Sequence, residues 1–220
     1  MNNYRYLIPL ILGLSFLNSS PRTAAQLIPD NTLGTENSVV TPLDLLNDRI
    51  DGGASRGINL FHSFLEFNVG NNRSAYFANP TGIENILTRV TGSNISNIFG
   101  TLGVLGNANL FLMNPNGIYF GPNARLDVSG SFLATTADGI QLGNRGYFSA
   151  TNPQGSQLLS VQPGALFTNA MRNYQAEINN QGDLAVGENL TLDADRLSLQ
   201  GQLQAGGDLT LQATDTVQIR

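Results

Sequence analysis

The sequence contains no cysteine, no tryptophan and no lysine, and it has a single histidine. The absence of cysteine excludes disulfide scaffolds, thiolate metal sites and cysteine nucleophiles, and one histidine excludes a metal site built from several histidines. Only 12% of the 220 residues are charged, and the net charge is −5. A nucleic-acid-binding protein would instead carry a basic stripe. We therefore expect no cofactor, no bound metal and no nucleic-acid partner.

The residues that are present favour many short strands separated by tight turns. Hydrophobic residues make up 41% of the chain, which is too large a share for a disordered acidic protein. Asparagine and glycine, which tight turns prefer, number 26 and 24. A large helical domain is not expected, because helices use alanine, leucine, glutamate and lysine in quantity. The composition therefore predicts an all-β fold.

The first 25 residues show the three regions of a secretory signal peptide in order. Arg5 supplies a positive charge, residues 7–17 (LIPLILGLSFL) form an apolar run, and small residues precede a cleavage point after Ala25. The apolar run has 11 residues, whereas a membrane-spanning helix needs about 20. We expect the Sec translocon to recognise this segment and export the chain. A buried N-terminal helix and a membrane anchor are the alternatives.

Strand-like runs that end at turn residues dominate the rest of the chain. Residues 58–69 (INLFHSFLEFNV) are rich in aromatic side chains and end at the turn residues 70–72 (GNN). Residues 110–113 and 118–120 are two further apolar runs, and the turn sequence NPNG separates them. This rhythm of short apolar runs and turns is typical of a protein built from many strands.

Two segments are candidates for short helices. Residues 83–90 (IENILTRV) place apolar side chains at positions 83, 86, 87 and 90, which is the spacing of one helical face. Thr81 and Glu84 would form a capping box at its start. A strand is the alternative for this segment. Residues 42–50 are a second and weaker helical candidate.

The C-terminal third contains an internal repeat. Residues 178–194 and 197–213 align at an offset of 19, with eight identities in 17 positions. This period fits one coil of a β-solenoid, and a leucine-rich repeat is the alternative. Glycine-rich turns stand where a leucine-rich repeat would place its helical return, so the repeat favours a parallel β-helix. Coils of about 20 residues would then stack, because a single coil buries too few apolar residues to be stable.

The sequence reaches Arg220 directly after a strand-like segment, residues 216–219, with no polar cap. An uncapped β-helix end has unpaired backbone groups that invite association. We expect the chain to be the N-terminal part of a longer rod, truncated at Arg220. A self-sufficient short protein is the alternative.

Two local patterns resemble catalytic or metal sites, but the context disfavours both. Residues 53–57 (GASRG) match the G-x-S-x-G elbow of hydrolases, which needs a helix after the serine, and a strand-like run follows here. His62 is the only available base, and we interpret it as a strand residue. Asp193 and Asp195 lie near Glu188, but no calcium-binding repeat is present, so we expect a solvated face. The sequence therefore predicts that the protein is not an enzyme.

The segment Asn114-Pro115-Asn116-Gly117-Ile118 is the most specific feature of the sequence. Proline fixes φ in a turn, and the Asn-Gly pair tolerates the left-handed backbone that leads back into a strand. In context, residues 89–138 strongly resemble the two-partner secretion (TPS) domain of filamentous-haemagglutinin-like exoproteins of Gram-negative bacteria. Residues 59–69 and 75–80 also resemble that family. Its members often carry an earlier Asn-Pro-Asn-Leu motif, and the nearest equivalent here begins at Asn79-Pro80 and continues as Thr-Gly.

The resemblance implies a fold, a route and a partner. The fold would be a right-handed, single-stranded parallel β-helix (β-solenoid) with N-terminal capping strands. Residues 1–25 would be the signal peptide, residues 26–170 the secretion domain, and residues 171–220 the start of the repeat rod. The route would be export through the periplasm to the cell surface or the extracellular space. The partner would be an Omp85/TpsB-type outer-membrane transporter acting through its periplasmic POTRA domains.

The resemblance also implies which residues the transporter recognises. The expected turn motifs are Asn79, Pro80, Asn114, Pro115, Asn116, Gly117 and Ile118. An alternative function is that of an extracellular β-helix that itself binds glycans or cell surfaces.

Overall fold

The computed structural model describes residues 26–158, 160–167 and 175–220. The predicted signal peptide, residues 1–25, lies outside the described residues. Nearly all regular structure in the described part is β-strand, and the one helical element there is the short 3-10 turn η1 (Pro153–Gly155). None of the helical structure in these ranges is long and apolar enough to cross a membrane.

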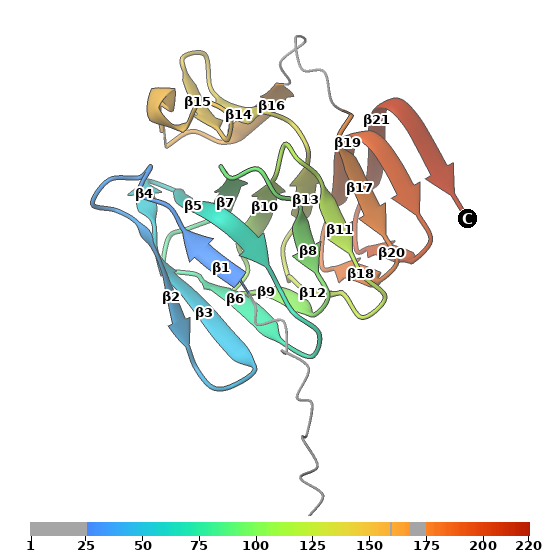
Figure 1. Ribbon diagram of the computed structural model, residues 1–220. Coiled ribbons are helices and arrows are strands. Elements are labelled where there is room, and N and C mark those ends of the chain that lie inside the picture. The colour runs from blue at the N-terminus through green and yellow to red at the C-terminus, as the bar shows by residue number, and fades with distance from the viewer. Residues whose placement is uncertain (1–25, 159, 168–174) are drawn as a thin grey trace, which may run out of the picture.

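The strands form a spiral in which each turn contributes to two sheets (Figure 1). The large sheet has the order β1-β5-β7-β10-β13-β19-β17-β11-β8, with β4 added beside β5 and β21 beside β19. Its strands are β1 (Gln26–Pro29), β4 (Ala54–Arg56), β5 (Asn59–Asn68), β7 (Asn85–Val90), β8 (Ser96–Ile98), β10 (Asn109–Met113), β11 (Ile118–Phe120), β13 (Phe132–Thr135), β17 (Glu177–Asn180), β19 (Leu190–Leu199) and β21 (Leu209–Ile219).

The second sheet of the spiral has the strand order β2-β3-β6-β9-β12-β18-β20. Its strands are β2 (Ser38–Pro42), β3 (Asn47–Gly52), β6 (Ser74–Ala78), β9 (Thr101–Leu105), β12 (Arg125–Asp127), β18 (Asp183–Val186) and β20 (Gln202–Ala205). Successive coils pair in parallel, as with β6 and β9 or β18 and β20. The predicted parallel β-helix is therefore confirmed.

The coils shorten along the chain. Asn59 pairs with Asn85, and Asn85 pairs with Asn109, so each of these coils is longer than one unit of the C-terminal repeat. Leu190 pairs with Leu209, which is the same offset as that of the sequence repeat. The expected coil length of about 20 residues is therefore too short for the first coils. Their corner loops are longer, so no constant period is visible in the sequence there.

Antiparallel strands cover the N-terminal end of the β-helix, as predicted. β1 and β4 pair antiparallel with β5, and β2 pairs antiparallel with β3. These added strands occupy backbone groups that the first coil would otherwise leave unpaired, which protects a sheet edge from further association.

Aromatic side chains are frequent in the core of the earlier coils, and aliphatic side chains fill the core after residue 176. The rings of Phe64 and Phe67 lie 5.0 Å apart, and those of Phe67 and Phe77 lie 6.0 Å apart. Leu190 and Leu192 point into the core of a later coil and are fully buried. Alternate residues of each strand therefore point into one continuous core.

Both helical candidates form other structures. β7 replaces the predicted helix at residues 83–90, and all six of its residues are buried. Ile86 faces the main core, while Leu87 packs in a second cluster on the outer face. A strand buried on both faces has no polar side, so its apolar pattern imitates a helix. Residues 42–50 form the end of β2, a turn and the start of β3. Asp44 fixes that turn by accepting hydrogen bonds from the Leu46 and Asn47 amides.

The chain leaves the spiral between β13 and β17 and forms a third, antiparallel sheet. Its strands are β14 (Gly139–Leu142), β15 (Gly146–Ser149) and β16 (Pro163–Phe167), in the order β15-β14-β16. We call this part, with η1, the excursion; it lies at one edge of the β-helix (Figure 1). Phe148 of β15 packs against Phe61 of β5, with ring centroids 5.0 Å apart. The excursion thus covers the outer face of the first coils.

Candidate functional site

The NPNG turn joins β10 to β11 at a corner between two strands of the large sheet. The Gly117 amide donates to the Asn114 carbonyl over 3.1 Å, and the Asn116 amide donates to Asn114 Oδ1 over 3.0 Å. Gly117 has a φ of +127°, a conformation that favours glycine. The sequence pattern therefore forms the tight turn that its residue types predict.

Asn114 lies at the centre of this corner and is fully buried. Its Nδ2 donates to the Asn94 carbonyl and to Ser96 Oγ, both over 3.0 Å, and these residues belong to the preceding coil. Its backbone amide donates over 3.0 Å to the carbonyl of Thr135 in the following coil. Through its side chain and its backbone amide, Asn114 therefore forms hydrogen bonds with the coil before its own and with the coil after it.

Asn116 and Gly117 also contact neighbouring coils at this corner. Asn116 Nδ2 donates to the Gly92 carbonyl over 2.8 Å and to Asn114 Oδ1 over 3.0 Å. A Cβ atom at Gly117 would lie 3.0 Å from the Glu177 carbonyl oxygen and 3.3 Å from Ile95 Cγ2. Two features therefore favour glycine at position 117: its backbone angle, and the close approach of the neighbouring coils.

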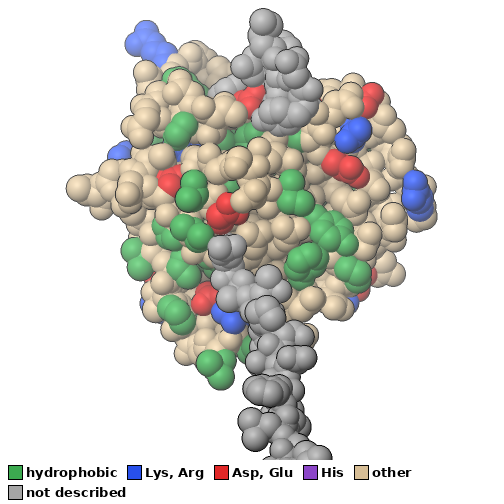
Figure 2. All heavy atoms as spheres, viewed as in Figure 1, with side chains coloured by type: hydrophobic (Ala, Val, Ile, Leu, Met, Phe, Trp, Pro, Cys, Tyr) green, Lys and Arg blue, Asp and Glu red, His purple; other side chains and the backbone are tan. Residues whose placement is uncertain are grey.

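Pro115 and Ile118 complete the motif and are also buried. Ile118 points into the main core and pairs with Ser96 and Ile178 on either side. None of the five motif residues carries a titratable group, and Figure 2 shows only scattered charged side chains on one face of the molecule. Four of the five motif residues are buried in the folded protein, whereas Asn116 is partly exposed and borders, with Ile118, a surface hollow of about 500 Å³.

The second predicted turn lies at a different corner. Asn79 follows β6 and precedes β7, so this turn joins the second sheet to the large sheet. Asn79 Nδ2 donates to the Ile83 carbonyl over 3.0 Å, and the Ile83 amide donates to the Pro80 carbonyl over 3.1 Å. Pro80 is exposed, and the turn borders a surface hollow of about 420 Å³ that Glu84 and Glu188 also line. The structure therefore does not bring the two predicted motifs together.

The patterns that resembled a catalytic or metal site have other structural roles. β4 lies within the GASRG segment and pairs antiparallel with β5, so no helix follows the serine. His62 lies in β5, as predicted, with Nδ1 3.1 Å from Ser38 Oγ. Asp193 accepts a hydrogen bond from Thr135 Oγ1 over 3.0 Å, and burial raises the pKa of this carboxyl group. Among the described residues, no group of three or more histidines and carboxylates could hold a metal ion.

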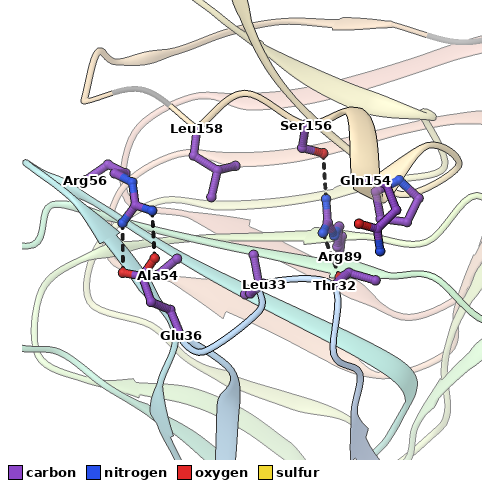
Figure 3. Close-up of a pocket in the computed structure, with 10 residues that line it drawn as sticks. Thr32, Leu33, Glu36, Ala54, Arg56, Arg89, Gln154, Ser156 and Leu158 are labelled. Atoms are coloured by element: carbon purple, nitrogen blue, oxygen red, sulfur yellow. Dashed lines mark hydrogen bonds and ion pairs between the residues drawn. The ribbon is translucent and has the colours of Figure 1, made fainter.

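Two polar features of the first coils were not predicted from the sequence. Asn59, Asn85 and Asn109 stack in successive coils, and each joins the next through an amide hydrogen bond of 3.0 Å. Arg89 of β7 is fully buried under the excursion (Figure 3). Two signals in the sequence could have indicated these features. Arg89 is a charged residue within an apolar run, and an asparagine recurs once in each of three successive coils.

This fold and this turn define a class of protein: a parallel β-helix with a capped N-terminal end, an extra-helical sheet and a buried NPNG corner. The family model of the TPS secretion domain matches residues 25–219. The chain therefore belongs to the TPS secretion domain family. Its members are exported proteins of the cell surface or the extracellular space.

Solved structures of two secretion domains are similar to this chain. The secretion domain of HMW1 from Haemophilus influenzae is 23% identical, with a TM-score of 0.55 over 80% of this chain and 42% of that one, and it supports the fold. The filamentous hemagglutinin secretion domain is 15% identical, with a TM-score of 0.46 over 88% of this chain and 99% of that one.

The heme/hemopexin-binding protein of Haemophilus influenzae is 28% identical over 143 residues. The match spans 63% of this chain but 14% of that protein.

Proposed function

We propose that this chain is the N-terminal secretion domain of an adhesin-like exoprotein. In this proposal an Omp85/TpsB-type outer-membrane transporter recognises the chain through its periplasmic POTRA domains. The family match over residues 25–219 supports the proposal. The predicted signal peptide and the Sec route stay predictions, as does the division at residue 170 between the secretion domain and a longer rod.

The hydrogen bonds of the NPNG corner bear on when the transporter recognises the chain. Asn114 directs its amide donors to Asn94 and Ser96, and Asn116 directs its own to Gly92 and to Asn114 Oδ1, so these donors are already paired in the folded corner. We therefore propose that the transporter reads this segment before the chain folds. A periplasmic domain can bind an extended segment by strand addition, with backbone hydrogen bonds and side-chain pockets. A chain without cysteine has no disulfide to constrain it during transit.

A secretion experiment with a matched variant tests this proposal. We would compare Asn114→Ala with Asn85→Ala in cells that carry the cognate transporter. Both residues are buried asparagines with several hydrogen bonds, but Asn85 lies outside the motif. At a similar loss of thermal stability, Asn114→Ala should reduce the protein in the medium far more than Asn85→Ala. Equal secretion of the two variants would contradict a recognition role for the motif.

A peptide measurement separates recognition from folding. A synthetic peptide of residues 105–122 cannot form the stacked coils, so its binding does not depend on their stability. It should bind the purified POTRA domains, and replacement of both Asn114 and Asn116 by alanine should weaken that binding. Binding of glycans or cell surfaces by the purified chain stays a separate prediction.

A further inference from the structure

Asn116 and Gly117 form the only Asn-Gly pair in the sequence. In such a pair the backbone nitrogen of the glycine can attack the side-chain amide carbon of the asparagine, because glycine has no Cβ atom to hinder the approach. This ring closure is one reason why asparagine counts among the thermolabile residues of proteins. In an unfolded chain, position 116 is therefore the asparagine most susceptible to the reaction.

The folded corner engages both reacting groups in other hydrogen bonds. The Gly117 amide donates to the Asn114 carbonyl over 3.1 Å, so the nitrogen that would attack is already bonded elsewhere. Asn116 Nδ2 donates to the Gly92 carbonyl over 2.8 Å and to Asn114 Oδ1 over 3.0 Å, so the side-chain amide cannot turn toward Gly117 without losing both bonds. Gly117 is also buried. The stacked coils therefore oppose the reaction.

We propose that Asn116 is a deamidation site whose reaction is controlled by folding. In the unfolded chain the Gly117 nitrogen gives up its proton and bonds to Asn116 Cγ, the bond from Cγ to Nδ2 breaks, and Nδ2 leaves with a proton as ammonia. A water molecule then opens the cyclic imide and leaves either an aspartate or an isoaspartate at position 116. Both products add a negative charge to a turn that has no titratable group. This proposal does not depend on transporter recognition.

Either product removes hydrogen bonds that the corner needs. A carboxylate accepts hydrogen bonds but donates none, so at position 116 it would face two acceptors, the Gly92 carbonyl and Asn114 Oδ1, where an amide now donates. Acceptors that lose their donor beside a negative charge destabilise the folded state. Isoaspartate also lengthens the backbone, which displaces Gly117 from the Asn114 carbonyl. A chain that stays unfolded therefore loses the bonds of the corner with time, whereas a folded chain keeps them.

Peptide mass spectrometry of the purified chain, after incubation in native buffer or in guanidinium chloride, tests the proposal, because it measures conversion at each asparagine separately. In denaturant, Asn116 should convert faster than any other asparagine of the chain. In native buffer its conversion should be at least about 100-fold slower, because only a very small fraction of native molecules is unfolded at any time.

Arg145→Gly supplies the matched control within the same chain. Asn144 and Arg145 are exposed in the turn between β14 and β15, and this substitution gives Asn144 the same following residue as Asn116. In the folded variant Asn144 should deamidate within about tenfold of its rate in denaturant, because an exposed turn opens readily, while Asn116 stays protected. The variant should keep the circular dichroism spectrum of the unmodified chain.

Several results would overturn the proposal. Equal conversion of Asn116 in native buffer and in denaturant would show that the corner does not protect it. Equal protection of Asn144 and Asn116 in the folded Arg145→Gly variant would show that the protection is not a property of the corner. Asn116→Asp, which reproduces the aspartate product, should lower the melting temperature by about 4–8 °C. An unchanged melting temperature would contradict the proposed consequence of the reaction.

Discussion

At the scale of single residues, buried asparagines determine how the coils stack. A buried amide side chain is favourable only when its donors and acceptors are paired, because an unpaired polar group loses its water without compensation. Asn114 meets this condition only when the preceding coil is in register. The Asn59–Asn85–Asn109 ladder imposes the same condition at another corner. These side chains therefore select one register among the many that parallel strands allow.

We predict that Asn114→Ala lowers the free energy of unfolding by about 2–4 kcal/mol, because it leaves Ser96 and the Asn116 amide without their partner. Urea denaturation followed by circular dichroism measures the change. Asn123→Ala is the control, since Asn123 is exposed and makes one amide contact of 3.3 Å; it should change stability by no more than about 0.5 kcal/mol. An equally small change in the free energy of unfolding for Asn114→Ala would show that the hydrogen bonds of this corner do not stabilise the stacking of the coils.

We predict that the free energy of unfolding decreases in acid because His62 is buried. Burial lowers its pKa from 6.5 to about 3, because the charged ring would lose its water. Below pH 6.5 the unfolded chain therefore binds a proton that the folded chain does not. The stability contribution is complete above pH 6.5 and decreases by up to about 1.4 kcal/mol per pH unit toward pH 3.

Urea unfolding between pH 7 and 4.5 measures this dependence, and His62→Phe should remove most of it. Asp30 adds a loss of the same sign at lower pH. Burial would raise its pKa, but hydrogen bonds from Thr32, Thr91 and Ser63 together hold it below its usual value. A pH profile that is the same in His62→Phe and in the unmodified chain would contradict the assignment.

At the scale of elements, the excursion explains why β7 resembles a helix in the sequence. The outer face of β7 and its neighbours is apolar because the excursion covers it, with Leu87 and Met113 in the same cluster as Ile140 and Phe148. Arg89 donates two hydrogen bonds to the excursion and lies 4.5 Å from the Phe148 ring centroid. The excursion is therefore part of the folded core rather than an appended loop.

We predict that Phe148→Ala lowers the free energy of unfolding by about 3–5 kcal/mol, through lost burial and the cavity left beside Phe61. Chemical denaturation measures the loss, and Gln141→Ala, at an exposed position of β14, should have little effect. If Phe148→Ala were as stable as Gln141→Ala, the excursion would not be packed against the coils as described.

The sequence predicts some elements well and others poorly for physical reasons. Residues 178–194 and 197–213 repeat at an offset of 19, and the paired strands keep this offset up to Ala194, so their stacking and the β-helix are predictable. The earlier coils differ in corner length, and the excursion interrupts one of them, so their period is hidden. The NPNG turn is predictable from local backbone preferences. The burial of Arg89 is not, because its partners Thr32 and Ser156 lie 57 and 67 residues away in the sequence.

At the scale of the whole molecule, the structure relates folding to export. Within the described residues, every strand of the spiral gains its partners from a neighbouring coil or from the cap, so the extended chain satisfies few of its backbone groups internally. Four of the five residues of the corner that the family resemblance assigns to the transporter are buried once the coils stack, and Asn116 stays partly exposed. In our account the segment is therefore available for recognition only before folding, and stacking of the coils then removes it from the transporter.

Hydrogen exchange of the chain bound to the transporter's periplasmic domains tests this account most directly. The free, folded chain should show strong protection of the amides in β7, β10 and β13, which lie in the centre of the large sheet. We predict that the bound chain loses this protection in β7 and β13 and stays protected only around residues 110–120, which include most of β10, where the transporter contacts it. Full native protection of all three strands in the bound chain would show that the transporter recognises the folded domain, and would contradict the account.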